Sequence, residues 1–304
     1  MSSHLTMPKV TVVIPVYNGE RYIRATLESV FAQTYQNYEI ICVDDGSKDG
    51  SVAVLGSYAE RIQVIRQANM GQAGARNAGV KRGTGTYVAL LDQDDLWYPW
   101  KLEHQVALLE AHPEAVMAHC DMDWIDEAGN VIQRNRVSAA RMSAPKGLTM
   151  TKVFGWDPCI YPSTTLIRKA AFERVGGFDP EIPWYGEDID LMLRLREEGQ
   201  FLFLEEAGTQ YRKHSSNCSG AGTDAMFHCA EKFFEKLKTR YARDRGKVAV
   251  LDKFLAQVYS DWGKTKMSSG LHREAQRLFL RSLKYHPWSV KTYSRLARAS
   301  APIF

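Results

Sequence analysis

The sequence predicts an α/β fold in which helices cover both faces of a mostly parallel sheet, followed by an all-helical extension. Strand and helix patterns alternate over the first 120 residues, as they do in chains built from βαβ units. After residue 214 only helical periodicity remains. Charge divides the chain too, because residues 231–304 carry 17 basic and 6 acidic side chains whereas residues 1–230 carry 22 and 29. We therefore expect two domains, at residues 1–220 and 221–304.

The elements of the first half follow from their residue patterns. Runs of β-branched and apolar residues predict five strands, at residues 10–16, 39–43, 62–66, 87–91 and 115–119. Helical spacing of apolar or small residues predicts helices at residues 20–33, 49–58, 71–82 and 99–111. Proline favours the first position of a helix, and Pro99 begins the last of these.

The rest of the chain is less regular until the extension begins. We expect a hairpin at residues 123–132, turning at 127–130, and a loop at 134–151. Strands are predicted at residues 163–167, 201–205 and 210–214, and helices at 169–175, 187–198, 224–242, 248–267, 271–285 and 288–298. Residues 255–288 resemble a single tetratricopeptide-like helical hairpin, which cannot bury its own apolar face and must pack on another surface.

Composition excludes several classes of protein. No apolar run approaches the roughly 18 residues that a membrane-spanning helix needs, and residues 1–9 lack the apolar core of a signal peptide. The five cysteines form no C-x-x-C pair, which argues against a zinc knuckle and a disulfide framework. Neither a Walker lysine loop nor G-x-G-x-x-G follows the first strand. We expect a cytoplasmic protein.

Polar clusters follow three of the predicted strands, at the carboxyl ends where open α/β sheets bind their ligands. Asn18 lies in the first cluster, Asp44 and Asp45 begin the second, and residues 92–95 (Asp-Gln-Asp-Asp) form the third. Converging carboxylates repel one another unless a cation lies among them, and oxygen ligands suit Mg²⁺ or Mn²⁺. Two structural interpretations stay open, an ordinary turn at Asp-Gly-Ser and a helix cap at Asp-x-Asp-Asp.

Seven segments together give the chain a family resemblance. They are VVIPVYNGERYI, VDDGSKDGS, NMGQAGARNAG, LLDQDD, GGFDP, WYGEDIDLMLRL and YRKHSSN. On these motifs, over roughly residues 10–219, the sequence resembles the family 2 glycosyltransferases of the GT-A fold. The resemblance implies transfer of a sugar from a nucleotide diphosphate donor, usually with inversion at the anomeric carbon. It also implies a Rossmann-like nucleotide-binding domain merged with an acceptor-binding half.

The resemblance assigns roles to the polar clusters. It implies that Asp92 and Asp94 form the D-x-D pair, with Asp94 on the metal and Asp92 on the ribose or the metal, although Asp95 leaves the register open. A histidine at the place of His214 completes the metal site or contacts the diphosphate. The positions that would bind the nucleotide are Pro15, Tyr17, Asn18, Glu20, Asp44, Asp45, Arg76, Asp92 and Gln93. A surface salt bridge is the alternative role for Arg76.

The acceptor hydroxyl loses a proton as it attacks, so a carboxylate must lie near it. Glu187 and Asp188 begin a predicted amphipathic helix, where the helix dipole favours negative charge. Helix capping alone would also explain them. The resemblance favours catalysis, with Asp188 as the base and Glu187 as a supporting acceptor ligand. Trp184 and Tyr185 directly precede the pair and would stack on the acceptor sugar, unless they pack in the core.

The leading interpretation is an inverting, metal-dependent glycosyltransferase of cell-surface polysaccharide assembly. Its donor would be a nucleotide diphosphate sugar, and its acceptor a glycan or lipid-linked glycan. The basic extension would attach it peripherally to an anionic membrane, at the inner face of the cell membrane, or pack as a solvated face on the acidic body. The alternatives are a sugar-nucleotide pyrophosphorylase and an inactive nucleotide-sugar-binding or scaffold protein. Nucleic-acid binding is not expected, because the extension has no aromatic-interleaved groove motif.

Overall fold

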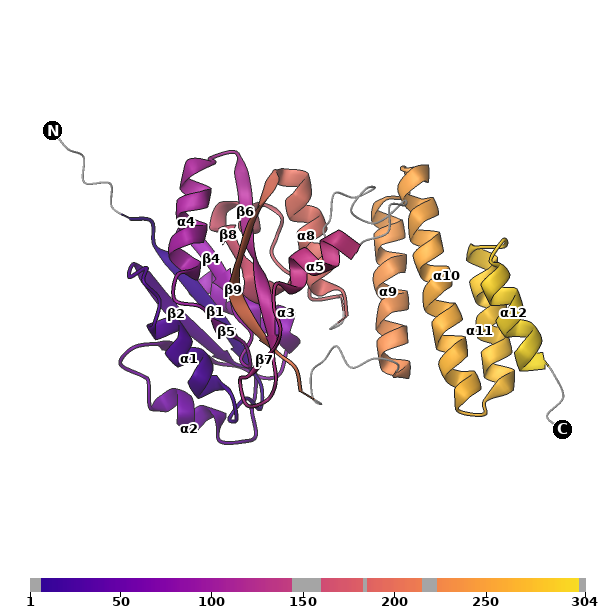
Figure 1. The fold of residues 1–304 in the computed structure, drawn as a ribbon, viewed down its shortest axis with the longest axis horizontal. Coiled ribbons are helices and arrows are strands. Elements are labelled where there is room, and N and C mark those ends of the chain that lie inside the picture. Colours follow the sequence, from indigo (N-terminus) through magenta and orange to yellow (C-terminus); the bar gives the residue numbers. More distant parts are fainter. Residues whose placement is uncertain (1–6, 144–159, 183–184, 215–222, 301–304) are drawn as a thin grey trace. The chain divides into compact units, whose positions relative to one another are not determined.

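The computed structural model describes residues 7–143, 160–182, 185–214 and 223–300 of the chain. Within these residues, contacts divide the chain into two compact units (Figure 1). The first unit comprises residues 7–143, 160–180 and 188–214, and the second comprises residues 181–182, 185–187 and 223–300. We describe each unit by itself.

A mixed sheet forms the centre of the first unit. Its first half is parallel, in the order β3 (Gln63–Arg66), β2 (Tyr38–Asp44), β1 (Val10–Val16) and β4 (Tyr87–Leu90). The order continues through β8 (Thr165–Arg168), β6 (Ala115–Ile125), β9 (Gln200–Arg212) and β5 (Leu96–Trp97), where only β6 and β9 pair in parallel. The short β7 (Val131–Gln133) pairs with β6 as the predicted hairpin.

Helices cover both faces of this sheet, because alternate residues of a buried strand point to opposite sides. On one face, Val12 and Ile14 of β1 belong to a core cluster with α1 (Ile23–Phe31) and α4 (Lys101–Ala111). On the other face, α3 (Gly71–Arg82) packs so closely that a Cβ at Gly79 would overlap Val13. The remaining helical segments of this unit include α2 (Ser51–Gly56), η1 (Pro162–Thr164), α7 (Lys169–Arg174) and α8 (Glu187–Glu198), whose first residue groups with the second unit.

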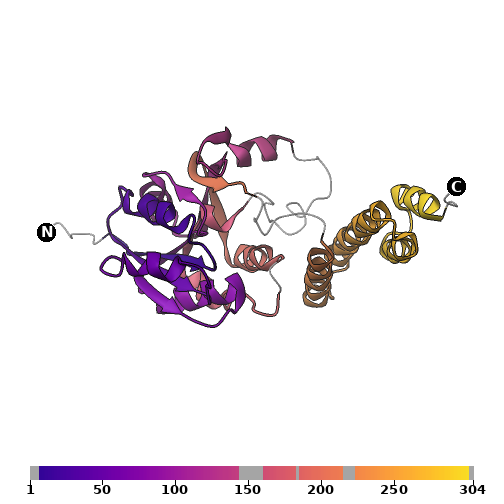
Figure 2. The same ribbon diagram turned by 90° about the horizontal axis from the view of Figure 1, so that it is seen from below.

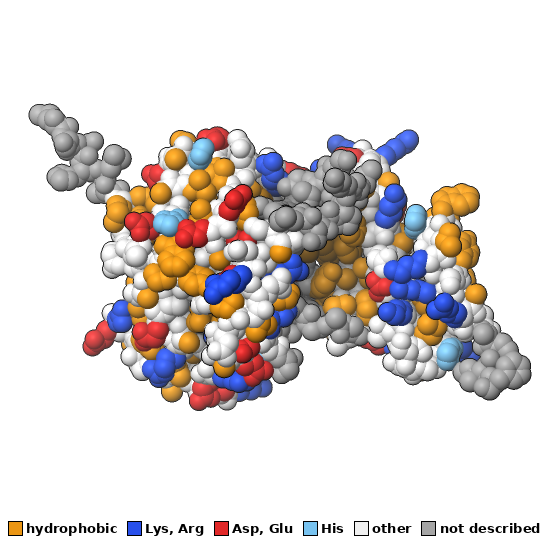
Figure 3. Space-filling model, in the orientation of Figure 1, with side chains coloured by type: hydrophobic (Ala, Val, Ile, Leu, Met, Phe, Trp, Pro, Cys, Tyr) orange, Lys and Arg blue, Asp and Glu red, His pale blue; other side chains and the backbone are white. Residues whose placement is uncertain are grey.

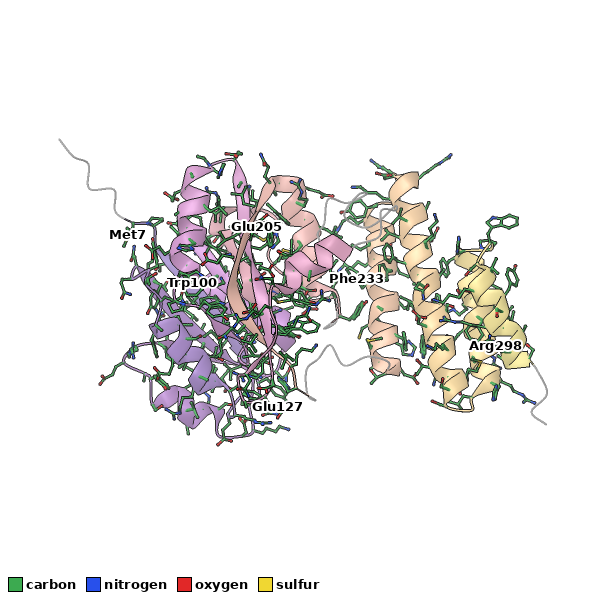
Figure 4. The ribbon with its side chains drawn as sticks, in the orientation of Figure 1. Met7, Trp100, Glu127, Glu205, Phe233 and Arg298 are labelled. Carbon is green, nitrogen blue, oxygen red and sulfur yellow. The ribbon has the colours of Figure 1, made fainter. Side chains whose placement is uncertain are left out.

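Two predicted elements need correction, and one short strand was not predicted. The segment from Arg136 to Ser143 is a helix, α5, where a loop was expected, and residues 144–151 of that expected loop lie outside the described residues. The two late strands are one strand, β9, with a bulge at Glu205 and Glu206 where the register against β6 shifts (Figure 4). The two-residue strand β5 was not predicted.

The second unit is built mainly from four helices that lie side by side in Figures 1 and 2, α9 (Asp224–Arg240), α10 (Arg245–Ser268), α11 (His272–Tyr285) and α12 (Val290–Ser300). A Cβ at Gly263 of α10 would lie 2.6 Å from Phe279 of α11, so this glycine permits the close approach of the two helices. None of the helices in the described ranges is long and apolar enough to cross a membrane. The predicted combination of an α/β sheet and a helical extension is confirmed.

Candidate active site

The parallel half of the sheet brings the three polar clusters to one edge. Val16, the last residue of β1, pairs with Asp44, the last residue of β2, and β4 lies on the other side of β1. The loops that begin at Tyr17, Asp45 and Leu91 therefore leave the sheet next to one another. Pro15 is half-buried in β1, two residues before the 43% exposed Tyr17.

The loop after β1 is held by a side chain from the acidic loop after β4. The Gln93 side chain accepts a hydrogen bond from the backbone N–H of Tyr17 (2.9 Å) and donates one to the Tyr17 carbonyl (3.1 Å). A Cβ at Gly19 would overlap Gln93 Oε1, so glycine is needed for this approach. The Gln93 amide thus fixes the backbone of Tyr17, whose ring is exposed. We call this pair of hydrogen bonds the Gln93 clamp.

The loops after β1 and β2 are joined by similar hydrogen bonds. The backbone N–H of Asn18, which has a φ of 51°, donates to Ser47 Oγ (3.0 Å), and Asn18 Oδ1 accepts from the N–H of Lys48 (2.8 Å). Glu20 Oε2 accepts from the N–H of Gly50 (2.9 Å). Both side chains therefore shape the edge of the site.

Asp44 and Asp45 are buried and shape their own loop. Asp44 Oδ1 accepts from the N–H of Ser47 (3.1 Å). Asp45 Oδ1 accepts from Gln67 Nε2 (2.8 Å) and from the N–H of Met70 (2.9 Å). Asp44 and Asp45 therefore have the structural role that a turn at Asp-Gly-Ser implies. The loop also lies at the edge of the sheet where ligands of such folds bind.

The three carboxylates of the acidic loop after β4 have different partners. Arg76 of α3 donates to Asp92 Oδ1 (2.5 Å), and His214 Nε2 lies 2.8 Å from Asp94 Oδ2. Asp95 is fully buried, and its carboxylate accepts from Ser163 Oγ (2.6 Å) and from the backbone N–H of Arg212 (3.0 Å). Asp92 and Asp94 keep part of their surface exposed, whereas Asp95 is enclosed in the fold.

Burial and the proximity of like charges raise the pKa of two carboxyl groups in this loop. Burial raises the pKa of Asp94, the charge of Asp92 raises it further, and the hydrogen bond from His214 offsets part of the rise. Burial, followed by the charges of Asp94 and Asp92, raises the pKa of Asp95 well above its ordinary value. Such a concentration of carboxylates attracts cations.

Arg212, at the end of β9, fastens this loop to the hairpin between β6 and β7. Its Nε donates to the carbonyl of Asp94 (2.9 Å), and its Nη1 donates to the carbonyls of Asp126 (3.1 Å) and Glu127 (3.0 Å). The guanidinium also lies over the ring of Tyr22, 4.9 Å from its centre.

Tyr22 supports the histidine of the site. Its ring stacks on the His214 ring with centres 5.1 Å apart and an angle of 30° between the planes. The Tyr22 hydroxyl is buried and has no hydrogen-bond partner within the part of the chain that the structure describes. Sequence reasoning missed Tyr22 and Arg212, although both lie inside the motifs VVIPVYNGERYI and YRKHSSN.

The predicted carboxylate pair is divided between the two units. Asp188 is partly buried at the start of α8, where its Oδ1 accepts from the N–H of Ile189 (2.7 Å). Burial raises the pKa of Asp188, the positive charge of Arg76 lowers it, and the charge of Asp92 raises it. Asp188 thus shares the electrostatic field of the Arg76–Asp92 pair. Glu187 is buried and groups with the second unit, where its charge acts on Cys229 of α9.

Of the two predicted acceptor aromatics, Tyr185 is described and Trp184 lies outside the described residues. Tyr185 packs edge-on against Phe233 of α9, with ring centres 6.4 Å apart (Figure 4). It also lines a cavity of about 220 Å³ whose other walls come from α9 and α10. Tyr185 therefore belongs to the second unit, and its stacking on a sugar stays a prediction.

The residues around Asp94 fit part of a metal site. Carboxylate oxygen and imidazole nitrogen are ligands that Mn²⁺ accepts, and Asp94 and His214 lie within hydrogen-bond distance of each other. Within the ranges that the structure describes, no group of three or more His, Cys, Asp or Glu is arranged to hold a metal ion. A cation here would therefore take further ligands from a bound diphosphate or from water.

Comparisons with known proteins identify sequences and folds that are similar to this chain. YibD of Escherichia coli, an uncharacterized glycosyltransferase, is 39% identical over 265 residues, which are 82% of this chain and 76% of YibD. TarS of S. aureus (residues 1–349), solved with UDP-GlcNAc, superposes with a TM-score of 0.63 at 16% identity, over 96% of this chain and 90% of that one. The mannosyltransferase PcManGT from Pyrobaculum calidifontis, solved with GDP-Man and Mn²⁺, superposes with a TM-score of 0.60 at 17% identity, over 97% of this chain and 87% of that one.

At such low identity the two solved structures establish the fold alone, which is of the GT-A type. The activity class rests on sequence. A family model described as "Glycosyl transferase family 2" matches residues 11–176, more than half of the chain. Together with the relationship to YibD, this match means that the chain is a glycosyltransferase and belongs to family 2 of these enzymes.

Proposed function

We propose that this enzyme transfers a sugar, with inversion and with the help of a divalent metal, from a nucleotide diphosphate donor to a hydroxyl of a glycan or lipid-linked acceptor. The observation that carries the proposal is the position of Asp188. Its partly buried carboxylate lies in the electrostatic field of Arg76 and Asp92. Asp92 belongs to the acidic loop after β4, whose three carboxylates contact Arg76, His214 and Ser163. A proton acceptor and a diphosphate-binding region thus occur together.

The donor lies across the edge formed by the loops after β1, β2 and β4. The exposed Tyr17 ring stacks on the base, supported from below by the Gln93 clamp. Arg76 is almost fully buried and forms an ion pair with Asp92, and its guanidinium would donate hydrogen bonds to the diphosphate. The complexes of TarS with UDP-GlcNAc and of PcManGT with GDP-Man support a nucleotide sugar as donor.

Asp94 and His214 would hold the metal, with Asp92 on the metal or on the ribose. When bound, a divalent cation neutralises charge on the diphosphate leaving group. Its identity as Mg²⁺ or Mn²⁺ is supported by the oxygen and nitrogen donors and by Mn²⁺ in the PcManGT complex. Asp95 has no part in binding, because Ser163 and Arg212 occupy its carboxylate.

Asp188 is the base. The acceptor oxygen attacks the anomeric carbon, the bond from that carbon to the phosphate oxygen breaks, and the hydroxyl proton passes to Asp188. A carboxylate whose pKa is raised holds that proton better than an exposed one does. The attack comes from the face opposite the leaving group, so the configuration inverts. Glu187 supports the acceptor, and Tyr185 and Trp184 bind its sugar.

We further propose that the enzyme acts in cell-surface polysaccharide assembly, on the cytoplasmic side of the membrane. Residues 1–220 form the transferase domain and residues 221–304 the helical domain. Asp188→Asn tests the reaction, because asparagine keeps the shape and the capping ability of the side chain but accepts no proton. We expect the transfer rate to fall by about 10²–10⁴-fold. Donor affinity, measured by calorimetry, should stay within about threefold of the parent protein.

Glu187→Gln is the matched control, because it removes the neighbouring carboxylate in the same way. It should slow transfer less than Asp188→Asn does. Product configuration is followed by nuclear magnetic resonance. If Asp188→Asn keeps a near-normal rate, the base lies elsewhere. If the parent protein binds the donor but never transfers the sugar, the inactive binding protein becomes the better interpretation.

A further inference from the structure

The outer face of α11 combines positive charge with an apolar side chain. Arg273, Arg277, Leu280 and Lys284 are all exposed. At 3.6 residues per turn they fall within an arc of about 60° on the helix. Leu280 exposes 57% of its surface at the centre of this stripe.

The next segment continues the same composition. Trp288 exposes 85% of its surface, Val290 exposes 81% and Tyr293 exposes 52%. Lys291 and Arg298 of α12 are exposed as well. Figure 3 shows blue Lys and Arg side chains gathered over the C-terminal helices, with orange hydrophobic side chains beside them. At 3.6 residues per turn, Tyr293 lies on the other side of α12 from Lys291 and Arg298. We call the other eight of these residues of 273–298 the basic–aromatic face.

Some basic side chains of this unit form ion pairs within it. Arg281 pairs with Glu231 (2.8 Å), Arg295 pairs with Asp261 (2.9 Å), and Lys266 bridges Asp224 and Glu274. These cations stabilise the contacts between helices. In contrast, no carboxylate of the described segments pairs with any of the five basic side chains of the basic–aromatic face. Their positive charge is therefore not neutralised by the described residues of the fold.

We propose that the basic–aromatic face docks on the surface of an anionic lipid bilayer. Charge complementarity selects the occupant, because anionic headgroups neutralise the five basic side chains. The aromatic and aliphatic side chains fit the same partner, since Trp and Tyr favour the boundary between headgroups and acyl chains. An acidic protein would match the charges, but it would leave unexplained why Trp288 and Val290 are almost fully exposed.

Vesicle sedimentation of the full chain tests the proposal without any need for catalysis. The vesicles are made of phosphatidylcholine alone, or with a quarter of it replaced by phosphatidylglycerol. We expect pelleting with the anionic vesicles only, and release at high salt, which screens the attraction. In Arg277→Gln/Lys284→Gln the partition coefficient should fall about 30-fold, because each basic side chain near such a surface contributes about a fivefold factor.

Lys81→Gln/Arg82→Gln is the matched control, since it removes two exposed positive charges from α3 in the first unit. It should reduce the partition coefficient by less than about threefold. A second readout is tryptophan emission, which should shift to the blue on anionic vesicles in the parent protein and shift much less in Trp288→Phe.

Three results would overturn the proposal. The first is no pelleting with anionic vesicles at low salt, and the second is an equal loss in the control variant. The third is a stable dimer in sedimentation equilibrium that Trp288→Ser dissociates, which would assign the basic–aromatic face to a second copy of the chain. None of these results depends on whether the enzyme transfers sugar, so the transferase proposal would stand or fall separately.

Discussion

Lys101, the first residue of α4, carries an amino group into the protein interior. The side chain is completely buried. Its Nζ donates to Gln105 Oε1 (2.7 Å) and lies 4.1 Å from the centre of the Trp97 ring. No ion pair to a described carboxylate compensates the charge, and burial lowers the pKa of Lys101 from 10.5 to about 8. At neutral pH the folded protein therefore carries a buried cation.

The energetic consequence follows from linkage. Between pH 8 and pH 10.5 the unfolded chain keeps the Lys101 proton and the folded chain does not, so the free energy of unfolding rises with pH. The gap between these pKa values corresponds to about 3 kcal/mol. Lys101→Met removes that cost but leaves Gln105 Oε1 without its donor, which costs about 1–2 kcal/mol. The variant should be about 1–2 kcal/mol more stable at neutral pH.

Above pH 10.5 the parent lysine is neutral in both states, so the order should reverse and Lys101→Met should be about 1–2 kcal/mol less stable than the parent. Urea unfolding followed by circular dichroism at several pH values measures the difference. Lys81→Met, at an exposed position of α3, is the control and should show no such pH dependence. A difference between parent and Lys101→Met that stays constant across this range would refute the reasoning.

Two further predictions concern the site. Gly19→Ala should weaken donor binding by about tenfold or more in calorimetry, because a Cβ would displace the Gln93 clamp; an unchanged affinity would mean that the clamp is irrelevant to the donor. Tyr22→Leu should weaken Mn²⁺ binding, measured by electron paramagnetic resonance, by about threefold to tenfold because the stack on His214 is lost. Tyr22→Phe keeps the ring and loses only a hydroxyl that has no hydrogen-bond partner among the described residues, so equal losses in both variants would contradict the positioning role.

Local patterns predicted the strands and helices whose causes lie within their own sequence. The runs at residues 10–16 and 71–82 became β1 and α3 with the predicted bounds. The helix α5 was missed because its cap is distant. Asp121 of β6 accepts hydrogen bonds from the N–H groups of Val137 (2.8 Å) and Ser138 (3.0 Å), so the helix start depends on a residue that no local window contains.

The site shows the same division. The acidic loop could be located from its composition, but the separate fates of its carboxylates could not. Asp95 is removed from the site by Ser163 and by the backbone of Arg212, both more than 60 residues away. Similarly, nothing in the adjacent letters of Glu187 and Asp188 indicates that the two side chains group with different units. Such outcomes depend on tertiary contacts rather than on residue pattern.

The hydrogen bonds of Arg212 tolerate side-chain substitutions in the hairpin formed by β6 and β7. The three guanidinium hydrogen bonds described above have main-chain oxygen atoms as acceptors, those of Asp94, Asp126 and Glu127. A main-chain oxygen is present whatever the side chain. Substitutions at the hairpin tip therefore leave the link to the acidic loop after β4 intact as long as the turn keeps its shape. Related enzymes can therefore differ in the side chains of this hairpin, and so in the molecules that the hairpin contacts, while the acidic loop after β4 keeps its conformation.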